Sequence, residues 1–362
     1  MKIGIDIQAS KGRMTGLGVY TKNLLKALLN ERPNGQEFIA FSKDQEGDWN
    51  TFQRLLWENA DLPKQVKRHQ VDILHIPAFS PPCVKPCRVV VTVHDLIGMI
   101  FSNQLGWPSR FYWGKWLPFV VKRADAIIAD SESTRNDLQK YLQIPASKIR
   151  VIYPSGHEGF SPLSSSKDQE KIRKRLGIRE KYFLCVGTLE PRKNFIRIAQ
   201  AFSRFIESKK DTRYQLVVVG LTDFAHGKFL KRVLQNCSSL ADSLILAGFQ
   251  SHEDLNLLYS GAEGFLFPSL YEGFGIPVLE AMASGTPVLT SRTSSLPEVA
   301  GEAAHYVDPN NLEEISEGIR SLAEDPGLRN KLIEKGFERI KRFSWRDTAL
   351  KTIEVYDGLQ KG

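Results

Sequence analysis

The sequence predicts an α/β protein of two domains, each built on a parallel, doubly wound sheet. Short apolar segments typical of strands alternate with helical segments in the first half of the chain, and the same alternation starts again in the second half. The length of 362 residues agrees with two domains, because a single core rarely extends beyond about 250–300 residues.

The first domain is expected over residues 1–160. Its strands are predicted at residues 2–7, 38–41, 72–76, 88–93, 126–130 and 148–153, with a helix at 20–30. The periodic pattern then stops at Pro154, Gly156 and Gly159, which predicts a linker at roughly 154–178.

The second domain is expected over residues 161–340. It opens with the apolar run YFLCVG, the pattern of a buried parallel strand, and further strands are predicted at 216–220, 244–247, 264–267 and 287–289. Residues 341–362 are predicted to form a helix that returns to the first domain. Both domains are therefore expected to be Rossmann-like, with ligands at the carboxyl ends of the strands.

Composition and charge narrow the class of protein. The N-terminus carries an acid at Asp6 and the longest apolar runs fall far short of the roughly 18 residues of a membrane span, so we expect a cytoplasmic protein. The net charge of +8 favours anionic partners. Nucleic acid is not expected among them, because no zinc finger or RNA-recognition signature is present.

The four cysteines are few and irregularly spaced, as suits reduced thiols. Cys83 and Cys87 near His75 could form half of a zinc site, but no second ligand pair follows. No aspartate cluster suited to a divalent metal stands out either, so no metal or other cofactor is expected.

The segment EGFGIPVLE sets Glu272 and Glu280 on either side of a glycine turn and Pro277. Proline fits the first positions of a helix, so a helix is predicted to start near Ile276, with Glu280 in its first turn. The N–H groups of Phe274, Gly275 and Ile276 would then bind an anion such as a phosphate, with the two carboxylates as acceptors for hydroxyls.

The segment GTLEPRKN follows the first strand of the second domain and leads into a helix near Asn194. Arg192 and Lys193 would lie beside the positive end of that helix, where an anion would offset their repulsion. Arginine offers a fork for two phosphate oxygens and lysine a compact charge, so the pair suits a diphosphate. A solvated Arg-Lys pair on the surface is the alternative.

Three further features of the first domain carry candidate residues. Gly16 and Gly18 follow the first strand and would let the backbone approach a ligand, or only form a tight turn; the loop lacks the third glycine of a dinucleotide site. His94 ends an apolar strand, either as a cleft residue or as a structural histidine. Residues 111–116, FYWGKW, would meet an acceptor or a bilayer surface, or pack as core and rim.

Taken in order, these motifs resemble the retaining glycosyltransferases of family 4, whose GT-B architecture has two facing Rossmann-like domains with the active-site cleft between them. The likeness runs over nearly the whole chain. Its motifs are Gly16-Leu-Gly18-Val-Tyr20, Val93-His94-Asp95, Ala129-Asp-Ser131-Glu-Ser133, Gly187 to Asn194, Gly248-Phe249, Glu272-x7-Glu280 and Ser294-Ser-Leu-Pro297-Glu298. Many members carry arginine where this chain has Thr188, and the PRKN form is similar to the subgroup that often uses GDP-mannose.

The resemblance implies a role for each candidate residue. His94 and Glu272 would be the catalytic residues beside the transferred sugar. The nucleotide sugar would be bound by Gly16, Gly18, Arg192, Lys193, Phe249, Phe274, Gly275, Ile276 and Glu280. Glu280 would hold the ribose, Arg192 and Lys193 the diphosphate, and Phe249 would border the base. No carboxylate is identified as a nucleophile, so front-face attack is expected.

The first domain is expected to bind a saccharide or lipid-linked saccharide acceptor, which suggests polysaccharide biosynthesis and peripheral contact with the inner face of a membrane. Other functions remain open on the same fold: a sugar-nucleotide epimerase, a phosphorylase, or a sugar- or nucleotide-binding protein without catalysis.

Overall fold

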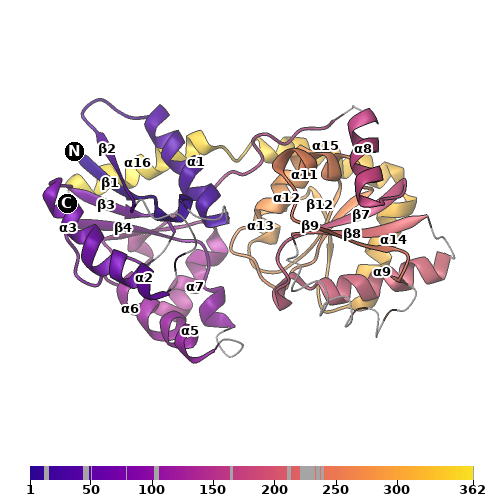
Figure 1. Cartoon of the computed structure of the whole chain (residues 1–362), viewed down its shortest axis with the longest axis horizontal. Helices are drawn as coiled ribbons and strands as arrows, with labels where there is room; N and C mark the ends of the chain where they lie inside the picture. Colours follow the sequence, from indigo (N-terminus) through magenta and orange to yellow (C-terminus); the bar gives the residue numbers. More distant parts are fainter. Residues whose placement is uncertain are drawn as a thin grey trace. The chain divides into compact units, whose positions relative to one another are not determined.

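The structure, a computed structural model, describes residues 1–11, 16–43, 49, 51–78, 80–101, 106–163, 166–209, 213–220, 233, 237 and 240–361. The chain divides into two compact units. The first comprises Met1–Ser155 and Phe343–Gly362, and the second Gly156–Arg342 (Figure 1).

The first unit has a parallel six-stranded sheet in the order β2-β1-β3-β4-β5-β6. Its strands are β1 (Lys2–Asp6), β2 (Glu37–Phe41), β3 (Ile73–Ile76), β4 (Arg88–Val93), β5 (Ala126–Ala129) and β6 (Ile149–Val151). Its helices are α1 (Gly16–Asn30), α2 (Thr51–Leu56), α3 (Leu62–Arg68), α4 (Ile97–Ile100), α5 (Trp107–Phe111), α6 (Leu117–Val121), α7 (Glu132–Leu142) and α16 (Trp345–Lys361). Shorter turns are the 3-10 helices Gln8–Ser10 and Ala146–Lys148 and the π-helices η2 (Trp57–Asp61) and η4 (Tyr112–Trp116).

Alternate residues of these strands enter two different cores. Ile73 and Ile128 pack with α1 and α16 on one face of the sheet, whereas Leu74 and Ile127 pack with α3 and α7 on the other. Strands buried on both faces explain why the sequence shows continuous apolar runs instead of alternation.

The helix α1 begins earlier than the sequence suggested, so Gly16 and Gly18 lie in its first turn and not in a loop. Residues 12–15 of the predicted glycine loop fall outside the described part of the chain. Gly18 has a local reason to be glycine, because a Cβ there would lie 2.6 Å from the carbonyl oxygen of Ala9. A Cβ on Gly16 would meet nothing within 4 Å.

The last helix, α16, belongs to the first unit and packs along α1 (Figure 1). Its Tyr356 is fully buried, and its hydroxyl lies 2.6 Å from Nδ1 of His75 on β3. Nε2 of His75 lies 2.9 Å from Oγ1 of Thr92 on β4. Burial lowers the pKa of His75 to about 3, so the imidazole is neutral and links the helix to the sheet.

The second unit has a parallel six-stranded sheet in the order β12-β11-β10-β7-β8-β9. Its strands are β7 (Lys181–Val186), β8 (Tyr214–Val219), β9 (Leu244–Gly248), β10 (Gly264–Phe267), β11 (Val288–Ser291) and β12 (Ala304–Val307). Its helices are α8 (Ser166–Leu176), α9 (Phe195–Lys209), α11 (His252–Ser260), α12 (Ile276–Ala283), α13 (Leu296–Ala300), α14 (Leu312–Glu324) and α15 (Pro326–Ile340), with a 3-10 turn at Pro191–Lys193.

The two sheets confirm the predicted fold class of two Rossmann-like α/β domains. The sequence missed β12, a four-residue edge strand with the half-buried His305 and Tyr306 at its centre. Across the described ranges, no helix combines the length and apolar character that crossing a bilayer requires.

Candidate functional site

The second unit brings two of the predicted motifs together at the middle of its sheet. Read from its other edge, the strand order is β9-β8-β7-β10-β11-β12, so the chain reverses direction across the sheet between β7 and β10. Ligands of open parallel sheets bind outside the carboxyl ends of the strands at such a point. Arg192 and Lys193 lie in the loop after β7, and Glu272 lies in the loop after β10.

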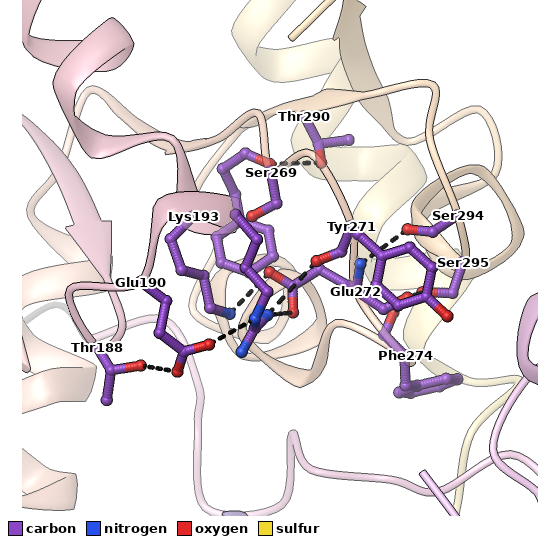
Figure 2. A network of polar contacts seen from close by, with 12 residues as sticks. Thr188, Glu190, Lys193, Ser269, Tyr271, Glu272, Phe274, Thr290, Ser294 and Ser295 are labelled. Atoms are coloured by element: carbon purple, nitrogen blue, oxygen red, sulfur yellow. Dashed lines mark hydrogen bonds and ion pairs between the residues drawn. The ribbon is translucent and has the colours of Figure 1, made fainter. Parts of the chain in front are cut away.

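These three side chains form an ion cluster in the interior of the unit. Glu272 is 6% exposed. Its Oε2 lies 2.8 Å from Nη1 of Arg192, and its Oε1 lies 2.7 Å from Nζ of Lys193. Glu190 approaches Arg192 from the other side, with Oε2 2.7 Å from Nε, and Figure 2 shows the side chains of Glu190, Lys193 and Glu272 converging.

The positive charges of Arg192 and Lys193 are already compensated within the unit. The sequence suggested that a bound anion would offset the repulsion between Arg192 and Lys193. In the structure two carboxylates, those of Glu190 and Glu272, supply that compensation. The ammonium of Lys193 also lies 4.6 Å from the centre of the Phe267 ring. An incoming anion would therefore compete with Glu272 for the two cations.

Hydrogen bonds from neighbouring segments fix both loops. The backbone N–H of Leu270 donates to the carbonyl of Arg192 at 2.7 Å, which joins one loop to the other. Asn194, at φ 63°, donates through Nδ2 to the carbonyls of Pro268 and Pro309 at 3.0 and 2.7 Å. The loops after three strands are thus held together by one buried amide.

The Glu272 loop is held from its other side by the start of α13 (Figure 2). The backbone N–H of Glu272 donates to Oγ of Ser294 at 2.9 Å. The hydroxyl of Ser295 donates to the carbonyls of Glu272 and Phe274 at 3.0 and 2.7 Å. These serines keep the carboxylate and the following backbone in place.

The helix α12 begins at Ile276, as Pro277 predicted, and Gly275 precedes it at φ 105°. The left-handed conformation favours glycine. A Cβ at Gly275 would also lie 3.0 Å from Leu296. The first N–H groups of a helix have no acceptor within the helix, so this end of α12 suits an anion.

Glu280 is the fifth residue of α12, so it lies just beyond the first turn in which the sequence placed it. Its side chain is only partly accessible, and its Oε2 accepts a hydrogen bond from the hydroxyl of Tyr259 at 3.0 Å. Burial raises the pKa of Glu280 to about 7, against the opposing effects of the Tyr259 hydroxyl and the Lys193 charge. The carboxyl group therefore changes charge near neutral pH.

Of the two predicted phenylalanines of this unit, one lies apart from the cluster and the other beside Glu272. Phe249 follows the edge strand β9, two strands from β7, and its side chain is 75% exposed. Phe274 is buried beside the Glu272 loop.

In the first unit, both ring nitrogens of His94 are engaged. Nδ1 lies 2.5 Å from Oδ2 of the buried Asp130, and Nε2 lies 2.7 Å from the carbonyl oxygen of Pro77. Burial alone would lower the pKa of His94, but the Asp130 carboxylate and the Pro77 carbonyl raise it above its ordinary value. Two acceptors around one imidazole favour the protonated ring, which suits an electrostatic role better than that of a base.

Several residues that support the site were not predicted as parts of it. Glu190, Tyr259, Ser294 and Ser295 contact the candidate residues directly. Ser294 and Ser295 lie within a motif of the family resemblance, so the sequence alone could have indicated them as site residues. Tyr259 lies on α11 with no motif around it, and only the fold reveals its partner.

Metal ligands do not gather in the described part of the chain, where no group of three or more histidine, cysteine or acidic side chains has the geometry to hold an ion. Cys83 and Cys87 are free, half-buried thiols.

The comparisons with known proteins identify the class. Residues 14–155 match the model described as Glycosyltransferase Family 4, and residues 168–339 match the model described as Glycosyl transferases group 1. The chain is 31% identical over 384 aligned positions to the O-antigen chain mannosyltransferase B of Escherichia coli, covering 98% of this chain and 99% of that protein. The chain therefore belongs to the glycosyltransferases of family 4.

Solved structures share the fold. A sucrose-phosphate synthase from Thermosynechococcus elongatus superposes with a TM-score of 0.76 at 19% identity, over 100% of this chain and 99% of that one. WaaG, a glycosyltransferase involved in lipopolysaccharide biosynthesis, has a TM-score of 0.72 at 17% identity, over 98% and 99%. With the two parallel sheets, these neighbours place the chain in the GT-B class.

Proposed function

We propose that this glycosyltransferase is a retaining enzyme that transfers mannose from GDP-mannose to a saccharide or lipid-linked saccharide. The observation that carries the proposal is the cluster of Arg192, Lys193 and Glu272 beside the start of α12, at the point where the sheet reverses. Mannose is proposed as the sugar because the chain is similar to a protein named as a mannosyltransferase.

The donor diphosphate would displace Glu272 from the two cations. Arg192 and Lys193 would then bind the phosphate oxygens, with the N–H groups of Gly275 and Ile276, and stabilise the charge that grows as the anomeric C–O bond breaks. Glu272, released from its ion pairs, would accept hydrogen bonds from the sugar hydroxyls. Glu280 would accept them from the ribose.

In this mechanism the acceptor oxygen attacks the anomeric carbon from the face that the diphosphate leaves. The leaving phosphate takes the proton of the acceptor hydroxyl, so no enzyme nucleophile is required. The proposal assigns charge stabilisation to the side-chain cations and the helix terminus, so it requires no metal. His94 would act as a cation near the transferred sugar. The backbone at Gly16 and Gly18 would approach the phosphate.

Transfer to octyl α-mannoside tests the proposal. With GDP-mannose and EDTA present, we expect an octyl dimannoside whose new linkage has the α configuration of the donor. Lys193→Gln and Glu272→Gln should each lower turnover by about 100-fold, the usual effect of losing one group that stabilises a transition state. The matched control is Lys174→Gln on α8, whose ammonium is exposed and paired with Glu170.

Four outcomes would contradict the proposal. A β-linked product would exclude retention. Full turnover by both site variants would exclude a role of the cluster in the transfer. Conversion of the donor without an acceptor would indicate an epimerase, and a requirement for inorganic phosphate would indicate a phosphorylase.

We also propose that a lipid-linked acceptor is met at the inner face of a membrane.

A further inference from the structure

The first unit carries a helical segment whose apolar side chains face outward. Residues 107–121 are helical without a break, through α5, η4 and α6. Trp107 is 79% exposed, Phe111 54% and Phe119 49%. On the opposite side Tyr112 and Val120 are buried, so the segment is anchored to the unit while its aromatic residues remain outside.

The π-helix η4 keeps these residues on one face. Trp107, Phe111, Lys115 and Phe119 are spaced by four positions, and in a pure α-helix of 3.6 residues per turn such a series drifts around the axis. A π-turn holds additional residues, because its hydrogen bonds run from i to i+5. Placed in the middle of the segment, η4 therefore counteracts the drift.

The anchoring is tight on the inner side. A Cβ on Gly98 of α4 would overlap the indole ring of Trp113, so α4 packs directly against η4. On the outer side, the rings of Trp107 and Phe111 stack with their centres 6.4 Å apart. The outward aromatic residues are thus supported by a fixed segment.

The charge of the segment is of one sign. Between Asp95 and Asp125 the sequence has no acidic residue, and it has four basic ones: Arg110, Lys115, Lys122 and Arg123. All four are exposed, and the guanidinium of Arg123 lies 5.6 Å from the centre of the Phe119 ring. Aromatic and basic side chains without acids match the boundary of an anionic bilayer, where rings enter the headgroup region and cations meet lipid phosphates.

We propose that the aromatic face formed by Trp107, Phe111, Lys115 and Phe119 docks on a bilayer that contains anionic phospholipid. The inference deepens the proposed function and rests on it for the membrane as a partner, because an enzyme with a lipid-linked acceptor must reach the bilayer surface. A protein partner fits less well, since lysine is depleted in the cores of protein interfaces.

Co-sedimentation with vesicles tests the proposal on the full chain without any nucleotide sugar. The wild type should bind vesicles of phosphatidylglycerol and phosphatidylcholine, and bind them more weakly in high salt than in low salt. The variant Trp107→Ser/Phe111→Ser should bind at least about tenfold less, because it removes the apolar side chains that enter the bilayer. Lys115→Glu/Arg123→Glu should lose binding to the anionic vesicles as well.

The matched control is Tyr141→Ser on α7, another exposed ring of the first unit, with the ammonium of Lys140 4.9 Å from its centre. It should bind vesicles as the wild type does. Circular dichroism and transfer to octyl α-mannoside should show that Trp107→Ser/Phe111→Ser remains folded and active, so loss of docking is distinct from loss of the proposed reaction.

Absence of wild-type binding, equal binding to neutral and anionic vesicles, or unchanged binding by Trp107→Ser/Phe111→Ser would overturn the proposal. So would a wild-type dimer that this variant converts to a monomer, because a second copy would then be the partner of the face.

Discussion

At the residue scale, Glu280 couples the candidate site to pH. Its pKa lies at about 7 in the folded chain, above the ordinary value of 4.5. The folded state thus retains a proton that the unfolded state has lost, and this group contributes less stability as pH rises between those values. Ionised Glu280 accepts stronger hydrogen bonds from hydroxyls than the neutral acid.

We therefore expect GDP-mannose to bind more tightly as pH rises from 6 to 8, by up to roughly tenfold, since Glu280 ionises within that window. Titration calorimetry at several pH values measures this dependence. GDP-mannose is the suitable ligand because its diphosphate has no proton to lose in this range. Glu280→Gln should bind it weakly and with no such dependence. A wild type with equal affinity at pH 6 and 8 would exclude the role of Glu280.

Single residues were predicted from the sequence where their local context was informative. Pro277 placed the start of α12, and the strand end at Gly187 placed Arg192 and Lys193 at the carboxyl end of a strand. The direct pairing of these cations with Glu272 was not predicted, because the residues lie about 80 positions apart and only the adjacency of β7 and β10 brings them together. No local pattern encodes that adjacency.

At the element scale, α16 completes the first unit. It covers one face of the sheet, and its Tyr356 gives the neutral, buried His75 a hydrogen-bond partner. Removing that hydroxyl would leave a polar atom of His75 buried without this partner, which costs about 1–3 kcal/mol.

Tyr356→Phe should accordingly lower the stability of the first unit by about 1–3 kcal/mol. Calorimetric unfolding should show one transition shifted downward, with the transition of the second unit unchanged. Leu350→Ala, an exposed position on the same helix, serves as the control. If Tyr356→Phe unfolds as the wild type does, the hydrogen bond contributes nothing to the attachment of α16.

The elements that the sequence missed share a physical cause. β12 is short, lies at the edge of its sheet and contains His305 and Tyr306, so it lacks the apolar run that identified its neighbours. The start of α1 was placed too late because glycines usually signal a turn. Here Gly18 permits close contact between α1 and the turn at Ala9.

At the scale of the whole molecule, the sequence predicted two parallel sheets but not their strand orders. The first unit changes direction between β1 and β3, and the second between β7 and β10. Strand order depends on which sheet faces the intervening helices cover, and a helical pattern alone does not show this. The order matters because it places the cluster of Arg192, Lys193 and Glu272 where the second sheet reverses direction, which is where open parallel sheets generally bind ligands.

Titration calorimetry with GDP-mannose, GDP, UDP-glucose and free mannose tests most directly whether that cluster binds a nucleotide sugar through its diphosphate. We predict that GDP-mannose and GDP bind and that free mannose does not. Lys193→Gln should weaken binding at least about tenfold, the effect of one lost charge-assisted hydrogen bond, and Lys174→Gln should not change it. Binding of free mannose without a nucleotide, or an unchanged affinity for GDP in Lys193→Gln, would show that the cluster does not bind the diphosphate.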